Sequence, residues 1–276
     1  ASDVAGVGLI GCGTIGSGVA KLLIEEAALY EQRVGRKIEL RCVLVKAGDE
    51  KNQTGEVPEH LITTDPETFW SADIDIVVEL AGGRGVISEF VRKALSMGKH
   101  VVTANKALVA AEGRELFALA RENDVSLAFE ASCAGGIPFI TALQFNLLSN
   151  RIQGMYGILN GTCNYILTQM LGAGKSYDTA LAEAQDAGFA EADPTLDVSG
   201  GDTAHKLAIL ASLAFGVEVR DEAIPCEGIQ SLNLEDVQFG AELGYEIKLL
   251  AIGEMTDAGL SLSVAPCFIS RDEQLA

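Results

Sequence analysis

Asp202 and Lys206 stand at positions i and i+4 of a segment that is otherwise strongly apolar. In a helix this spacing puts both side chains on one face. A charged pair on a largely buried helix must face a partner or a cleft, and three more carboxylates lie just upstream in residues 191–197. Such a cleft suits a substrate that has an ammonium group, bound by the carboxylates, and a carbonyl group beside the lysine. On a solvated surface the same pair would be an ion pair of little energetic worth.

A glycine-rich turn near the N-terminus has the spacing of a dinucleotide-binding fingerprint. Gly11, Gly13 and Gly16 follow a short apolar run, residues 7–10, and open a helical pattern. The first glycine permits a tight turn, the second lets the backbone approach a pyrophosphate, and the third lets helix and strand pack closely. The helix N-terminus then faces the phosphates. The pattern predicts an NAD(P) site, and a glycine turn without a ligand is the alternative.

Two lysines follow strand-like runs at the expected ligand edge of the sheet. Lys46 ends the run 39–45, where such sites usually have a carboxylate for the adenosine ribose. A cation there accepts a 2′-phosphate, which favours NADP, whereas Asp49 is near enough to reverse this preference and Lys46 is equally compatible with a solvated loop. Lys106 follows the run 100–103, and we expect it near the nicotinamide. The alternative is a surface lysine that starts a helix.

The first half of the chain alternates strand-like and helical patterns. The strand-like runs are residues 7–10, 39–45, 74–80, 100–103 and 126–129, and the helical ones are 15–28, 86–97 and 112–122. Such alternation predicts an α/β fold, a Rossmann-like dinucleotide-binding domain whose parallel sheet is covered on both faces. The rhythm changes in the Gly/Pro stretch 134–138, so we place the first domain at residues 1–134.

Residues 135–276 have a different rhythm. An apolar segment at 152–159 precedes helical patterns at 165–171, 177–187 and 202–215, and strand-like runs at 247–254 and 260–269 follow. Ser176 is the expected N-cap of the 177–187 helix, and Gly216 closes the 202–215 helix. This half therefore predicts an α+β substrate domain.

Composition excludes several classes of partner. The 39 acidic and 20 basic residues give a formal charge of −19, which repels nucleic acid and anionic lipid, so we expect neither nucleic-acid nor membrane binding. The six cysteines form no CxxC pair, and only three histidines could join them as ligands, so neither zinc nor a disulfide framework is indicated. Because the sequence has no signal peptide and no long apolar run, we expect a cytoplasmic protein.

Six motifs together resemble the successive motifs of homoserine dehydrogenases, in order and at family spacing. They are GCGTIG at 11–16, TANK at 103–106, EASCAGGIP at 130–138, NGTCNY at 160–165, GFAEADP at 188–194 and DTAHK at 202–206. The resemblance covers residues 7 to 266, and the stretch 191–206 is its most specific part. It implies NAD(P)-dependent interconversion of L-homoserine and L-aspartate 4-semialdehyde in threonine, methionine and isoleucine biosynthesis.

The resemblance also implies roles for individual residues. Thr14 and Ile15 would line the dinucleotide, Gly82 would lie near the nicotinamide ribose, and Lys106 would touch both cofactor and substrate. Lys206 would be the acid/base, directly or through a water. The residues expected around the amino-acid end of the substrate are Gly161, Thr162, Glu191, Asp197 and Asp202.

Two further implications concern a cation and a partner. In this family a monovalent cation, usually sodium, binds backbone carbonyl oxygens of the positions that match Glu130, Cys133, Gly135 and Ile137. A hard cation prefers such oxygen ligands. The family also forms dimers through the sheet of the second domain, so a homodimer is expected. The apolar runs 247–252 and 260–264 would supply its surface, or else simply be core strands.

The chain departs from the family pattern at two places. Phe189 stands where many members have Tyr, so a hydroxyl that bonds the substrate would be missing, unless that ring only packs. Family members also continue past the position of Ala276 with more sheet, so we expect the second domain to be incomplete at this end. Two other functions stay open: a different amino-acid dehydrogenase of the same architecture, and an impaired or truncated protein that binds NAD(P) without catalysis.

Overall fold

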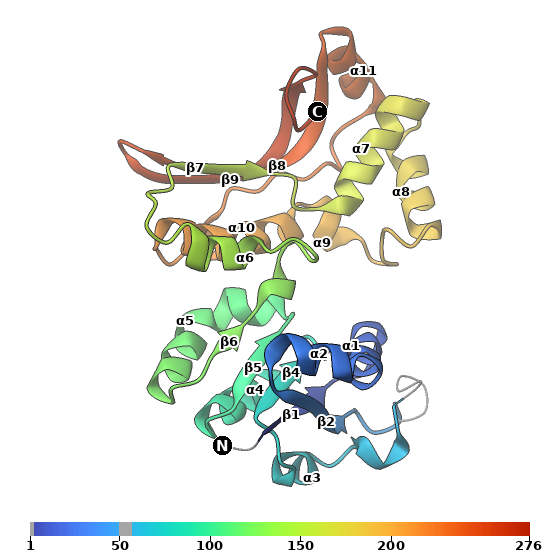
Figure 1. Ribbon diagram of the computed structural model, residues 1–276. Helices are drawn as coiled ribbons and strands as arrows, with labels where there is room; N and C mark the ends of the chain where they lie inside the picture. The colour runs from blue at the N-terminus through green and yellow to red at the C-terminus, as the bar shows by residue number, and fades with distance from the viewer. Residues whose placement is uncertain (1–2, 50–56) are drawn as a thin grey trace. The chain divides into compact units, whose positions relative to one another are not determined.

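The chain folds into two compact units. A computed structural model describes residues 3–49 and 57–276 (Figure 1). The first unit is Ala1–Pro138 and the second is Phe139–Ala276. The division falls at the end of the Gly/Pro stretch 134–138, a few residues beyond the boundary placed after residue 134.

The first unit is built on a six-stranded parallel sheet with the strand order β3-β2-β1-β4-β5-β6. Its strands are β1 (Val4–Ile10), β2 (Lys37–Leu44), β3 (Ile62–Thr63), β4 (Ile76–Glu79), β5 (His100–Thr103) and β6 (Leu127–Ala128). This is the order of a doubly wound dinucleotide-binding fold, which binds its ligand outside the carboxyl ends of the strands where the order reverses. That point lies between β1 and β4, so the predicted Rossmann-like domain is confirmed.

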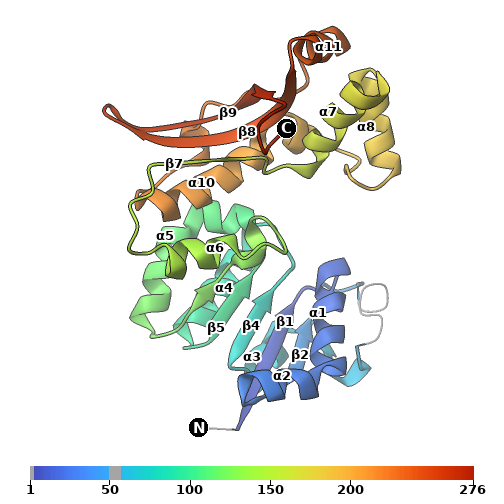
Figure 2. The same cartoon turned by 45° about the horizontal axis from the view of Figure 1, so that its top comes forward.

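Helices cover both faces of this sheet (Figure 2). They are α1 (Thr14–Glu25), α2 (Ala27–Val34), the 3₁₀ turn η1 (Glu59–Leu61), α3 (Pro66–Ser71), α4 (Val86–Ser96) and α5 (Lys106–Glu122). Val7 and Leu9 of β1 pack with α1, whereas Ile10 packs in a second cluster with α4 and α5. Alternate residues of a buried strand thus supply two cores, as expected for a doubly covered sheet.

Two predicted helix boundaries in this unit were wrong. The segment predicted as one helix at 15–28 is interrupted after Glu25, and α2 begins at Ala27. The helix predicted from residue 112 begins at Lys106, because the Asn105 side chain accepts a hydrogen bond from the backbone of Leu108 and caps the helix there.

The second unit places helices against a three-stranded antiparallel sheet, β7-β8-β9. The strands are β7 (Gly154–Gly157), β8 (Tyr245–Thr256) and β9 (Gly259–Ser270), and the helical segments are α6 (Phe139–Thr141), the π-helical η3 (Ala142–Asn146), α7 (Gly161–Ala173), α8 (Tyr177–Asp186), α9 (Thr195–Val198), α10 (Gly201–Phe215), η4 (Asp221–Ala223) and α11 (Leu234–Glu242). Its core joins α7, α8 and α10 to β8. The predicted α+β character is confirmed.

The start of α7 lies earlier than predicted. The pattern predicted a helix from residue 165, but α7 begins at Gly161 because the Asn160 side chain caps it. By contrast, Ser176 caps α8 and Gly216 ends α10, as predicted. Asn160 therefore ends the loop after β7 and fixes the first turn of α7, which is the part of the fold that builds the site described below.

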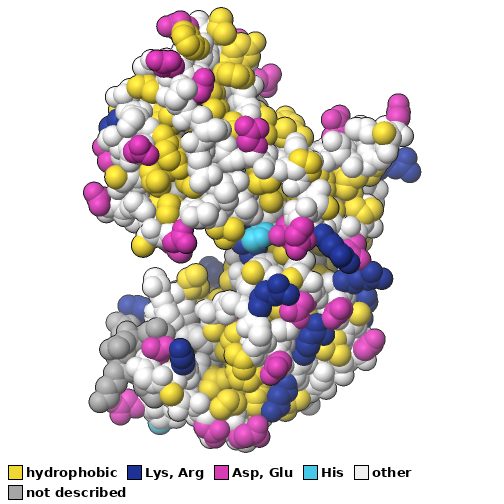
Figure 3. Space-filling model, turned by 180° about the vertical axis from the view of Figure 1, so that it is seen from behind, with side chains coloured by type: hydrophobic (Ala, Val, Ile, Leu, Met, Phe, Trp, Pro, Cys, Tyr) yellow, Lys and Arg dark blue, Asp and Glu magenta, His cyan; other side chains and the backbone are white. Residues whose placement is uncertain are grey.

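On the face shown in Figure 3, acidic and basic side chains lie among exposed hydrophobic ones. Arg92 of α4, for example, pairs with Glu112 and Glu115 of α5. In the described parts of the chain, every helix is too short or too polar to cross a membrane.

Candidate active site

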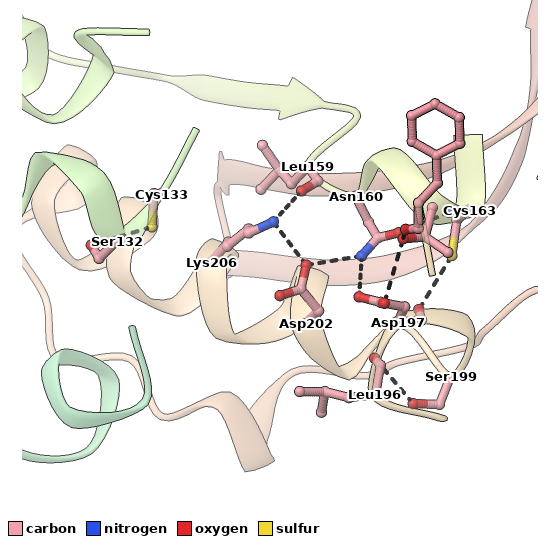
Figure 4. Close-up of polar contacts among 12 residues, drawn as sticks. Ser132, Cys133, Leu159, Asn160, Cys163, Leu196, Asp197, Ser199, Asp202 and Lys206 are labelled. Atoms are coloured by element: carbon pink, nitrogen blue, oxygen red, sulfur yellow. Dashed lines mark hydrogen bonds and ion pairs between the residues drawn. The ribbon is translucent and has the colours of Figure 1, made fainter. Parts of the chain in front are cut away.

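The predicted pair on α10 forms a close ion pair. Nζ of Lys206 lies 2.8 Å from Oδ2 of Asp202 and donates a second hydrogen bond, 2.6 Å long, to the carbonyl of Leu159 (Figure 4). The Asp202 side chain is 9% exposed and that of Lys206 is 20% exposed. The prediction that both residues share one helix face is confirmed, and the pair is held largely away from water.

Asn160 connects this pair to the second carboxylate of the site. Its Nδ2 donates to Oδ1 of Asp197 at 2.7 Å and to Oδ2 of Asp202 at 2.9 Å. Its Oδ1 accepts the backbone N–H of Cys163 at 2.8 Å, the capping bond of α7. Asn160 is 4% exposed, so these bonds replace those its amide would make to water. This asparagine belongs to the motif at 160–165, but its position in the sequence predicted no role for it in the site.

Residues at the start of α7 complete the site. Oγ1 of Thr162 donates to the carbonyl of Phe189 at 2.7 Å and lies 3.4 Å from Oδ2 of Asp197. The thiol of Cys163 donates to the backbone carbonyl of Asp197. Burial, with the negative charges of Asp197 and Asp202, raises the pKa of this thiol to about 12. Cys163 is therefore a neutral donor that supports the loop.

A pocket of about 610 Å³ is lined by Asn160, Thr162, Asp197, Asp202 and Lys206. Its wall also includes Gly161, Asn164, Tyr165, Thr168 and Phe189. The Tyr165 and Phe189 rings pack with centroids 4.9 Å apart, and 58% of Phe189 is exposed. Four of the five residues predicted around the substrate, all except Glu191, therefore lie on one pocket. Glu191 is exposed, and its carbonyl accepts from Gln185 on the neighbouring α8.

The glycine turn of the first unit has the geometry that a dinucleotide requires. Gly11 has a φ of +89°, and a Cβ there would lie 2.6 Å from the backbone nitrogen of Ala81. A Cβ on Gly16 would lie 2.3 Å from the Gly11 carbonyl oxygen. A Cβ on Gly13, in contrast, would have no heavy atom of the described residues within 4 Å, and no side chain caps α1 there. The first-turn N–H groups of α1 thus fit a phosphate.

The other predicted cofactor residues lie at the carboxyl edge of the same sheet. Thr14 and Ile15 are exposed on the first turn of α1, and Lys46 is exposed just after β2. Asp49 donates its backbone N–H to the Lys46 carbonyl, so one turn carries both candidates for the adenosine end. Lys106 is the first residue of α5.

The segment predicted to bind a cation is a series of turns. It contains the 3₁₀ turn η2 (Glu130–Ser132) and a turn closed by the Ile137 N–H on the Ala134 carbonyl. Ala134 and Gly136 have positive φ, at 50° and 83°. Among the described residues there is no cluster of three or more His, Cys, Asp or Glu that could hold a metal, and the donors expected here are instead backbone carbonyls such as those of Cys133 and Gly135.

Comparison with known proteins gives matches over both units. The family model for homoserine dehydrogenase matches residues 138–276, and that for the NAD binding domain of homoserine dehydrogenase matches residues 11–130. The homoserine dehydrogenase of Pseudomonas aeruginosa is 46% identical over 271 residues, which are 98% of this chain and 62% of that protein. The chain thus spans about three fifths of the length of this relative.

Solved structures of homoserine dehydrogenases also match the chain. A homoserine dehydrogenase from Thiobacillus denitrificans has a TM-score of 0.91 and 45% identity, covering 98% of this chain and 63% of its own. A hyperthermophilic archaeal homoserine dehydrogenase in complex with NADPH shares the fold, with a TM-score of 0.80 at 24% identity and coverage of 99% and 84%. Given two family models that together span most of its length, the chain belongs to the homoserine dehydrogenase family.

Proposed function

We propose that this protein catalyses the NAD(P)-dependent interconversion of L-homoserine and L-aspartate 4-semialdehyde, in the cytoplasm and as a step of threonine, methionine and isoleucine biosynthesis. The observation that carries the proposal is the Lys206 ammonium, fixed between Asp202 and the Leu159 carbonyl on a pocket that also presents Asp197. Family membership and the glycine turn of the first unit support it.

Lys206 is proposed to move the proton. A bound nicotinamide cofactor supplies or accepts the hydride at the carbon that is the aldehyde in one direction and the alcohol in the other. An ammonium has three protons, and within the described residues Asp202 and the Leu159 carbonyl accept two of them. Lys206 gives its remaining proton to the developing alkoxide in reduction and takes it back in oxidation. Lys106 is proposed to add positive charge beside that oxygen.

The acidic side of the pocket suits the amino-acid end of the substrate. Asp197 and Asp202 are proposed to attract its ammonium, together with Glu191 from the adjacent loop, while Gly161 and Thr162 lie at the N-terminus of α7, where backbone N–H groups attract a carboxylate. The Phe189 ring would pack on the substrate without a hydrogen bond to it, since it has no hydroxyl.

For the cofactor we propose NADP in preference to NAD, on the basis of Lys46 just after β2. The archaeal relative that is described in complex with NADPH is compatible with this preference. The measurement is kcat/KM for the two reduced cofactors. A preference of about tenfold or more for NADH would contradict it, since one contact to the 2′-phosphate commonly changes affinity by about this factor.

Two smaller proposals follow from the same likeness. A monovalent cation such as sodium would bind the carbonyls of Glu130, Cys133, Gly135 and Ile137, which activity titrated with NaCl against choline chloride would test. A homodimer would form through the sheet of the second unit, where Tyr156 of β7 is 72% exposed. A Tyr156→Glu substitution is then expected to yield monomers in analytical ultracentrifugation, and an unchanged sedimentation coefficient would contradict this interface.

Replacing Lys206 by Ala tests the proposed chemistry. Loss of a general acid–base group should lower kcat by about 10²–10⁴-fold and leave the cofactor Kd unchanged. Lys175→Ala is the matched control, because this lysine also lies in the second unit and is also held by a carboxylate, Glu183. Turnover near that of the wild type in Lys206→Ala would remove Lys206 from the mechanism.

A further inference from the structure

A buried carboxylate in the first unit has no part in the function proposed above. Glu79 is the last residue of β4, and none of its surface is exposed. Its Oε1 accepts the backbone N–H of Gly82 at 2.9 Å, and its Oε2 accepts the hydroxyl of Thr103 at 2.6 Å. A carboxylate is costly to remove from water unless its oxygens are bonded in this way. An apolar side chain would pack at the end of a buried strand without that cost, so the carboxylate needs another explanation.

The two bonds of Glu79 belong to a closed ring. Thr103 lies beside Glu79 in the β4–β5 register, and its Oγ1 also accepts the backbone N–H of Asn105 at 2.9 Å. The Asn105 side chain donates back to the carbonyl of Gly83 at 2.6 Å. The ring therefore runs from β4 through the loop after it to the start of α5, and returns through β5.

Each side of the ring holds an element that faces the ligand edge of the sheet. Gly82 and Gly83 have φ of +69° and +78°, so this loop is built from residues with the greatest backbone freedom to lose. On the other side, Asn105 is the N-cap of α5, and Lys106 is the first residue of that helix. All these residues lie in the first unit, and Thr103 and Asn105 are buried.

We infer that Glu79 is a positioning residue: it fixes the loop through Gly82 and the start of α5 with Lys106 in the conformation that binds the nicotinamide half of the dinucleotide. This rests on the proposed cofactor function. A loop that adopts its binding conformation only part of the time binds more weakly in proportion, so the ring raises affinity by holding the loop in place before the cofactor arrives.

Four variants test this role. Glu79→Ala removes both acceptors, and Thr103→Val removes the hydroxyl with almost no change in size. Glu79→Gln retains the side-chain shape and can bond both Gly82 and Thr103. Asp75→Ala is the control. Asp75 lies directly before the first residue of β4, at the opposite end of the strand from Glu79, and accepts the backbone N–H of Gly6 at 2.8 Å.

The readouts are the Kd for NADPH and for NADH, and amide hydrogen exchange of residues 80–85 without nucleotide. We expect Glu79→Ala and Thr103→Val to raise the Kd of the preferred cofactor about tenfold or more, because the loss of a buried hydrogen bond commonly has an effect of this magnitude. Both variants should also speed amide exchange in this loop. Glu79→Gln should stay within about threefold of the wild type, and Asp75→Ala should bind as the wild type does.

Unchanged Kd and exchange in folded Thr103→Val would overturn the inference even if Glu79→Ala failed to fold. An equal loss of binding in Asp75→Ala would also overturn it, because the effect would then be general destabilisation. If the wild type bound neither nucleotide, the proposed cofactor function would fail instead, and the exchange of residues 80–85 would still decide whether Glu79 holds the loop.

Discussion

At the scale of single residues, the site depends on one amide. Asn160 donates from a single nitrogen to both Asp197 and Asp202, and its oxygen caps α7 at Cys163. Two carboxylates that share one partner repel each other unless donors offset their charge. Asn160 and Lys206 provide those donors, so the amide both orders the acidic side of the pocket and joins it to the helix that presents it.

We predict that Asn160→Ser impairs the reaction without unfolding the protein. Serine still caps a helix but lacks the two-pronged donor, so kcat/KM for homoserine should fall about tenfold or more, the effect of losing one charged hydrogen bond. Asn233→Ser makes the same change at the N-cap of α11, outside the pocket. The test is the kinetics and thermal unfolding of both variants. An equal, small loss of stability with unaltered kcat/KM in each would mean that Asn160 acts only as the N-cap of α7.

A second prediction concerns pH. The Cys163 pKa is raised from 9.0 to about 12, chiefly by burial, so folding favours the protonated thiol. This contribution to stability is complete below pH 9 and is lost as the pH rises toward 12. The free energy of unfolding should therefore fall more steeply across this range in the wild type than in Cys163→Ala. Parallel curves from denaturant titrations of the two proteins would refute the assignment.

The sequence predicts some of these residues and not others for a physical reason. Asp202 and Lys206 interact within one helix, so their spacing alone predicts the contact. The partners of Asn160 lie 37 and 42 positions away, and Thr103 lies 24 positions from Glu79. Such pairs arise from the packing of elements, which local spacing does not contain. Glu191 shows the converse: its motif is specific, yet its side chain is not among those that line the pocket.

At the scale of elements, the glycines in the turn from β1 into α1 are required for different reasons. Gly16 is needed for packing, because a Cβ there would meet the Gly11 carbonyl, whereas the space beside Gly13 is open in the described structure. A methyl group should therefore be tolerated by the fold at Gly13 and should meet only an incoming ligand.

This difference is measurable with one substitution at two places. Gly13→Ala should keep the thermal stability of the wild type but weaken cofactor binding about tenfold or more, because the methyl group keeps the pyrophosphate from the backbone. Gly16→Ala should lower the melting temperature through overpacking, by an amount that corresponds to about 1–3 kcal/mol. Wild-type cofactor affinity in Gly13→Ala would mean that the pyrophosphate lies elsewhere.

Long, strongly patterned elements such as α4 and α10 were predicted, and errors collect at boundaries and in short elements. The starts of α5 and α7 depend on the asparagine caps Asn105 and Asn160, which an apolar period does not reveal. The α11 helix was missed, although Asn233 and Asp236 form a capping box that could have indicated its start. The short α3 is held by Phe69 and Trp70 in the core, a tertiary effect.

At the scale of the whole molecule, each unit has one part of the proposed reaction. The first is a parallel-sheet domain with a dinucleotide turn, and the second is an α+β domain with an acidic pocket and a lysine. The net charge of −19 is compatible with small-molecule chemistry, and the acidic residues of the pocket are proposed to bind the ammonium group of the substrate. The choice of homoserine comes from family membership, and the pocket by itself indicates only an amino acid with a carbonyl or alcohol carbon.

The most direct test is homoserine-dependent reduction of NADP⁺ and NAD⁺ by this chain, followed by nicotinamide absorbance, with a full-length relative assayed in parallel as the positive control. Other amino alcohols and amino acids serve as competing substrates, and Lys206→Ala serves as the impaired variant. We predict reduction with L-homoserine that is faster with NADP⁺ and about 10²–10⁴-fold slower in Lys206→Ala. Reduction should be at least about tenfold weaker with every other substrate, since the pocket would leave polar groups unpaired. Cofactor binding by this chain without homoserine-dependent reduction, or an equal rate with another amino acid, would contradict the proposed function.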